Sequence, residues 1–108
     1  MLKTKMLKPH SVVVVSLHTP KERIWGELLE TNSAGITLRG VDVDSFDIFV
    51  RQARDPEGES VVLPTLFFPM ARLERIALDE RRGSVPSLAD LFEQKVGCTL
   101  GAYLARFE

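Results

Sequence analysis

The most regular apolar pattern in the chain is a run of β-branched residues near its start. Residues 12–15 are four consecutive valines, and Leu17 extends the run. Apolar side chains at successive positions are typical of a strand that is covered on both faces. We therefore predict a buried first strand from Val12 to Leu17, and a polar turn at 18–22 that leads out of it.

Residues 23–31 alternate between two sets of side chains, as a second strand would. One face carries Ile24, Gly26 and Leu28, and the other carries Trp25, Glu27 and Leu29. A glycine inside a strand is typical of a sharp bend or of close approach by another backbone. The turn tetrad 32–35 and renewed alternation over 36–39 predict a hairpin between the second and third strands.

The periodicity changes from two to about 3.6 after Asp44. Asp44 or Ser45 can cap a helix here, and 55–56 can end it. The spacing favours a short helix, while an extension of the third strand with Phe46, Ile48 and Val50 on one face stays open as the alternative. The helical reading places four residues at i, i+3, i+4 and i+7: Phe46, Phe49, Val50 and Ala53.

Two further apolar segments complete the β pattern. Residues 61–63 and 66–70 are fourth-strand material, in which Pro64 and Pro69 predict a break, a bulge or an edge, because proline donates no ladder hydrogen bond. Residues 73–79 predict a fifth strand. The fold class is therefore mainly β, as a small, strongly bent five-stranded antiparallel barrel with a short inserted helix and a C-terminal helical extension.

The strongest boundary follows the fifth strand, in the charged run 79–84. Beyond it, Ser87 and Asp90 have the spacing of a capping box, Gly97 can end the helix, and Thr99 can begin another. These two helices either pack on the barrel or dock on a partner. We predict an N-terminal arm over 1–11, a barrel over 12–79 and a helical extension over 80–108.

The balance of basic and acidic residues limits the kinds of partner that the protein can attract. The 108 residues hold 14 basic and 15 acidic side chains, for a net charge of −1, so no global field attracts a polyanion. Lys3, Lys5 and Lys8 form a short basic arm, which is either a solvated tail or a contact to phosphate. With one cysteine, Cys98, and no apolar leader, the expected compartment is the cytoplasm, with no membrane contact.

No set of residues in the sequence points to catalysis. His10 and His18 lack the spacing of metal ligands, and the acidic stretch 42–47 lacks the glycine and the glutamate of a calcium loop. Cys98 lies between apolar helix patterns, as a packing thiol does. We therefore expect no enzyme activity, no metal, no cofactor and no small-molecule substrate.

The order of these elements resembles the Sm-like superfamily, which includes the bacterial host factor Hfq, over about residues 12–79. The resemblance is carried by the five strands, by Gly26 and Leu28 in the second of them, and by residues 67–76 leading into the fifth. It implies a bent five-stranded barrel that forms homo-oligomeric rings, the fourth strand of one subunit pairing with the fifth of the next, and that binds single-stranded RNA.

The residues that would bind RNA depart from the pattern of that superfamily. Its turn acid, base-stacking residue and base-contacting asparagine correspond to Asn32, Ala34 and Ile36, and its second motif falls on Pro69 and Met70. Alanine offers neither a flat ring nor a hydrogen-bonding edge to a base. The resemblance therefore implies weak or atypical RNA binding at most.

The remaining candidates divide into two groups. Polar side chains near the implied RNA loops are Asn32, Arg39 and Arg72; apolar candidates for a subunit contact are Phe67, Phe68 and Leu73. We expect a non-catalytic Sm-like protein that self-associates. The alternative is a protein-interaction module without nucleic acid, which uses the helices of 88–107 or the edge near Pro69.

Overall fold

The computed structural model describes residues 7–55, 57 and 61–107. Within these residues the protein is mainly β, with five antiparallel strands, three α-helices and two 3-10 turns. The elements are β1 (Val12–Leu17), β2 (Glu22–Thr31), β3 (Gly35–Asp42), η1 (Val43–Ser45), α1 (Phe46–Ala53), β4 (Thr65–Pro69), η2 (Met70–Arg72), β5 (Leu73–Leu78), α2 (Leu88–Val96) and α3 (Leu100–Ala105).

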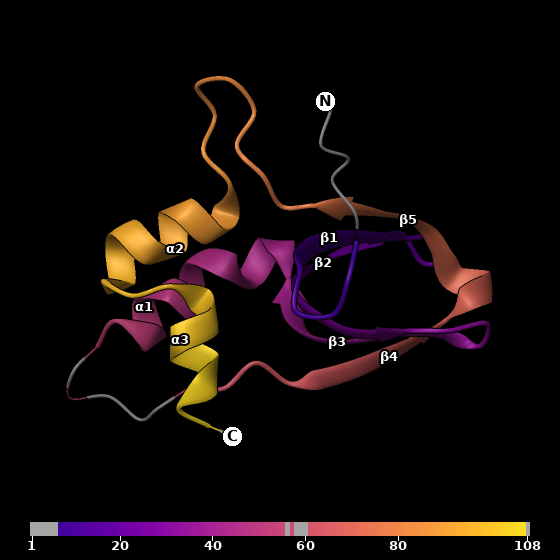
Figure 1. Cartoon of the computed structure of the whole chain (residues 1–108), viewed down its shortest axis with the longest axis horizontal. Coiled ribbons are helices and arrows are strands. Elements are labelled where there is room, and N and C mark those ends of the chain that lie inside the picture. Colours follow the sequence, from indigo (N-terminus) through magenta and orange to yellow (C-terminus); the bar gives the residue numbers. More distant parts are fainter. Residues whose placement is uncertain (1–6, 56, 58–60, 108) are drawn as a thin grey trace.

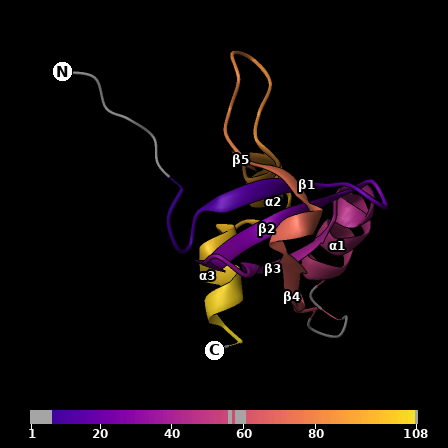
Figure 2. The ribbon, with the colours of Figure 1, turned by 90° about the vertical axis from the view of Figure 1, so that its right-hand side faces the viewer.

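The strands form one open sheet in the order β4-β3-β2-β1-β5. Figure 1 shows the sheet bent, with β1 and β5 on one side and β3 and β4 on the other. The three helices gather at one end of the sheet, and the chain between β5 and α2 stands out as a long loop (Figures 1 and 2). The edges of the sheet are β4 and β5.

Strand β1 is covered on both faces, as its apolar run predicts. Val13, Val15 and Leu17 are fully buried on one face, whereas Val12 and Val14 pack on the other. The first face belongs to an aliphatic group that we call the inner cluster. Its buried members are Val13, Val15, Leu17, Ile24, Leu28, Ile36 and Leu38.

The opposite face of the sheet packs against the helices around Trp25. We call this group the outer cluster, and Trp25 meets Phe46 edge to face with ring centres 5.0 Å apart. Its buried members are Trp25, Phe46, Phe49, Val50, Leu63, Phe92, Leu100, Tyr103 and Leu104. Strand β2 therefore supplies both clusters from its two alternating faces.

Gly26 has the mechanical role that its position in a strand predicts. A Cβ atom at Gly26 would lie 1.9 Å from the carbonyl oxygen of Arg39 and 2.5 Å from the Cα of Gly40. Both are backbone atoms of β3, directly across the ladder. No side chain fits between the two strands at this point, so they approach more closely than any other residue would permit.

The segment after β3 is a helix, which decides between the two alternatives left open by the sequence. Helix α1 spans Phe46–Ala53 and buries Phe46, Phe49 and Val50. Of the two predicted capping residues, Asp44 and Ser45, Ser45 occupies the N-cap position, but its side chain makes no cap hydrogen bond. The Asp42 carboxylate instead accepts a hydrogen bond from the amide of Asp44, at the start of the preceding turn η1.

The fourth strand is shorter than its apolar pattern suggests. The prediction that residues 61–63 belong to the strand is wrong, because they precede β4 and Leu63 turns into the outer cluster. The ladder to β3 reaches only as far as the Pro64 carbonyl, which accepts from the Gly40 amide at 3.0 Å. Pro69 is tolerated because β4 is an edge strand and the nitrogen of this residue points away from β3, whereas Pro64 precedes the first residue of the strand.

The C-terminal helices pack on the sheet. The Ser87 and Asp90 capping box is present, and Gly97 ends α2 in the left-handed conformation at φ 94°. Thr99 caps α3. Since the buried residues of both helices belong to the outer cluster, they are not left as a free docking face. No described helix is long and apolar enough to cross a membrane.

Candidate functional site

The outward edge of β4 presents unused backbone groups. The amide of Met70 donates to the Ala34 carbonyl, and the amide of Gly40 donates to the Pro64 carbonyl. Since antiparallel hydrogen bonds recur at every second residue, the N–H groups of Thr65 and Phe67 point away from β3. No described strand pairs with them. This edge can therefore accept another strand.

The three predicted interface residues do not have the same surroundings. Phe67 is 54% exposed on β4, and Met70 beside it is 46% exposed. Phe68 and Leu73 instead pack against the inner cluster. Of the three, only Phe67 offers a large apolar surface to a partner.

The opposite edge of the sheet is β5. The amide of Asp79 donates to the Val12 carbonyl at 2.9 Å, which sets the hydrogen-bonding phase of the ladder between β1 and β5. By the same two-residue period, the backbone groups of Ile76 and Leu78 point outward. Their side chains pack on the inner cluster, so this edge presents backbone rather than apolar side chains.

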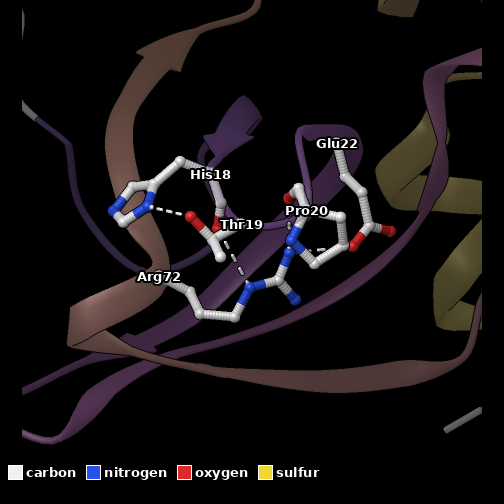
Figure 3. A network of polar contacts seen from close by, with 5 residues as sticks. All are labelled: His18, Thr19, Pro20, Glu22 and Arg72. Atoms are coloured by element: carbon white, nitrogen blue, oxygen red, sulfur yellow. Dashed lines mark hydrogen bonds and ion pairs between the residues drawn. The ribbon is translucent and has the colours of Figure 1, made fainter.

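The Arg72 guanidinium contacts groups of its own chain. Its guanidinium donates to the carbonyls of His18 (3.3 Å) and Pro20 (2.7 Å), and to the Glu22 carboxylate at 2.9 Å. Figure 3 shows this group lying against the turn between β1 and β2. It also lies over the Phe68 ring, 5.9 Å from the ring centre. Arg72 thus ties that turn to the connection between β4 and β5.

The other two predicted RNA residues also make contacts within the chain. The Asn32 side-chain oxygen accepts hydrogen bonds from the amides of Ala34 (2.8 Å) and Gly35 (3.3 Å), which shapes the hairpin turn. The Arg39 guanidinium pairs with Glu27 at 2.8 Å, where the two side chains are only 14% and 10% exposed. Asn32, Arg39 and Arg72 are therefore each engaged in separate contacts within the chain.

A different group of arginines surrounds a hollow that the sequence analysis did not single out. Arg23, Ser16 and Arg75 are register partners across β2, β1 and β5. They line a cavity of about 600 Å³, together with Arg82 from the loop before α2. In the sequence these are three polar residues of three separate strands, and only the strand register shows that they are neighbours.

The described residues contain no group of three or more histidine, cysteine or acidic side chains placed to hold a metal ion. His10 contacts Glu27, 3.2 Å from Nδ1 to the carboxylate oxygen, and His18 contacts Thr19 at the same distance. The two histidines therefore serve separate local contacts. Comparison of the chain with protein-family models, with curated proteins and with solved structures finds no match.

Proposed function

We propose that the protein is a non-catalytic Sm-like small barrel that self-associates, with β4 of one copy adding to β5 of the next. The observation that carries this proposal is that no described strand pairs with the outer side of either edge of the open sheet. The β4 edge bears the exposed Phe67, whereas the β5 edge presents backbone groups. Edge strands pair readily when nothing covers them.

A contact between two different edges is head to tail, so each copy keeps one edge available for the next. Such contacts give a ring if the rotation closes and a filament if it does not. The bend of the sheet favours closure. Leu66 and Phe68 of β4 pack on the same inner cluster as Leu73 and Ile76 of β5, which supports a barrel-like curvature.

RNA binding is the part of the proposal with less support from the geometry. Asn32 shapes its own turn, Arg39 pairs with Glu27, and Arg72 holds the turn between β1 and β2. RNA would have to compete with these contacts. We therefore propose weak or atypical binding of single-stranded RNA, through phosphate rather than through a base pocket.

The second candidate is a module that binds another protein, and the exposed edge near Pro69 favours it. Val62, Phe67 and Met70 are each about half exposed, an unusual concentration of apolar surface along one segment. The helices no longer support this candidate, because their apolar residues are buried in the outer cluster.

The oligomeric state tests self-association directly. Light scattering of the full chain should give a multiple of the 12.1 kDa monomer mass. Phe67→Lys should shift it toward monomer, because it places a charge on the pairing edge. Ile48→Lys is the matched control, since Ile48 on α1 is also 54% exposed, and it should leave the mass unchanged.

A monomer at every concentration would contradict self-association. Titration with labelled uridine-rich and adenine-rich RNA at low salt separates the two candidates. Binding that weakens as salt is added supports the RNA part, because phosphate contacts release counterions. An absence of RNA binding together with a monomeric mass favours the protein-interaction module.

A further inference from the structure

We infer that the hollow beside Ser16, Arg23 and Arg75 binds the phosphate group of a small organic phosphate. This inference goes beyond the proposed function and does not depend on self-association. The hollow lies on the face of the sheet that carries the outer cluster, and its lining comes mainly from β1, β2, β5 and the loop that leads to α2.

The strand register brings the two strand arginines together. Ser16 on β1 is the partner of Arg23 on β2 and of Arg75 on β5. Register partners project to the same face of a sheet, with neighbouring strands about 4.8 Å apart. Arg23 and Arg75 therefore flank the small Ser16 side chain at about 10 Å from each other, close enough for both guanidinium groups to reach one anion.

The carboxylates of Glu22 and Glu27 pair with groups other than the arginines of this hollow. Glu27 contacts Arg39 and His10, and Glu22 contacts Arg72. Asp79 and Glu80 also line the hollow. The Asp79 carboxylate already accepts hydrogen bonds from Trp25 and from the amides of Leu88 and Ala89.

Ser16 places a small polar side chain between the two arginines. The residue as a whole is 8% exposed and lines the hollow. Because Ser16 lines the hollow between the two arginines, its hydroxyl is placed to donate to a phosphate oxygen held by them.

The size and lining of the hollow indicate the class of ligand. Its volume of about 600 Å³ falls within the range of small-molecule sites. Guanidinium groups match phosphate with paired hydrogen bonds. The rest of the wall is largely apolar, from Val14, Val43, Ala77 and Leu88. This combination suits a phosphate attached to an apolar or aromatic body, for which a nucleoside monophosphate is the natural probe.

The test is calorimetric titration of the full chain with adenosine monophosphate, inorganic phosphate and a short single-stranded RNA, each separately. We expect adenosine monophosphate to bind with a Kd of about 1 mM or tighter. Arg75→Gln and Arg23→Gln should each weaken binding about tenfold, and Ser16→Ala by a smaller factor. Arg51→Gln, which removes an exposed arginine on α1, is the control and should bind like the wild type.

The outcomes distinguish this site from the edge contact. Loss of binding in Arg75→Gln with the light-scattering mass unchanged supports a separate phosphate site. No saturable binding, or equal weakening in Arg51→Gln, would overturn it. If inorganic phosphate bound as tightly as adenosine monophosphate, the apolar wall would have no role in binding. If the RNA bound and adenosine monophosphate did not, the ligand would not be a small organic phosphate.

Discussion

The two apolar clusters lie on opposite faces of one sheet but are built differently. All seven buried residues of the inner cluster are aliphatic and come from strands. Five of the nine in the outer cluster are aromatic, and most come from helices. The inner cluster packs branched side chains of one bent sheet against each other, whereas the outer cluster fills the space between the sheet and three helices. Large rings fill that space.

Beside each cluster, a charged side chain links two elements of the fold through hydrogen bonds. Arg72 ties the turn between β1 and β2 to the end of β4, beside the inner cluster. Asp79 ties Trp25 to the start of α2, beside the outer cluster. The comparison suggests two packing units that share β2, each with its own polar link.

The largest expected effect comes from removing a buried side chain in either cluster. Phe92→Ala should lower the free energy of unfolding by about 3–5 kcal/mol, and Leu38→Ala by about 2–5 kcal/mol. Phe92 is fully buried and stacks on Phe49 with ring centres 5.6 Å apart. Urea denaturation measures both changes.

Hydrogen exchange of the same two variants tests whether the clusters are separate units. Phe92→Ala should speed exchange in α2 and α3 more than in β1 and β2, because its contacts are with the outer cluster. Leu38→Ala should do the reverse. Equal acceleration throughout in both variants would show that the two faces open together.

The link at Asp79 should have an intermediate effect. One carboxylate oxygen accepts from the Trp25 indole and the Ala89 amide, and the other accepts from the Leu88 amide. In Asp79→Asn the side-chain amide replaces one oxygen, so at least one donor loses its acceptor. We expect a loss of about 1–3 kcal/mol.

The control for this variant is Asp44→Asn, an exposed aspartate whose replacement should change stability by less than about 0.5 kcal/mol. Trp25 is the only tryptophan of the chain, so its fluorescence reports on the outer cluster directly. Identical spectra and stabilities for the two variants would mean that Asp79 does not connect the sheet to α2.

The elements that could be predicted from the sequence are those with local causes. The valine run, the hairpin turn at Asn32 and the capping box at Ser87 each act within a few residues. Trp25 and Asp79, by contrast, are 54 positions apart. Such a pair carries no periodic signal, because only the folded register makes its members neighbours.

The same reason explains the candidate sites. Arg72 was selected from its place in a loop, but its partners lie 50 to 54 positions away and occupy its guanidinium. Arg23 and Arg75 lie in β2 and β5, which are not neighbours in the sheet, and no local pattern links the two residues. Their common partner Ser16 is what brings them to one hollow, and that follows from a strand order that alternation alone does not specify.

The smallest expected effect comes from the link at Arg72. Lysine keeps the charge in Arg72→Lys but has no planar fork to reach two carbonyls and a carboxylate together. The side chains of Arg72 and Glu22 are 26% and 36% exposed, so solvent weakens their ion pair. We expect a loss of about 1 kcal/mol in urea denaturation.

Arg51→Lys on α1 is the matched control and should leave stability unchanged. If Arg72→Lys also left the free energy of unfolding unchanged, the contacts of Arg72 to His18, Pro20 and Glu22 would contribute nothing to stability. The guanidinium would then be available at little cost to an RNA phosphate. A measured loss instead means that any RNA bound there must first displace a stabilising contact, which favours the arginines around Ser16 as the phosphate site.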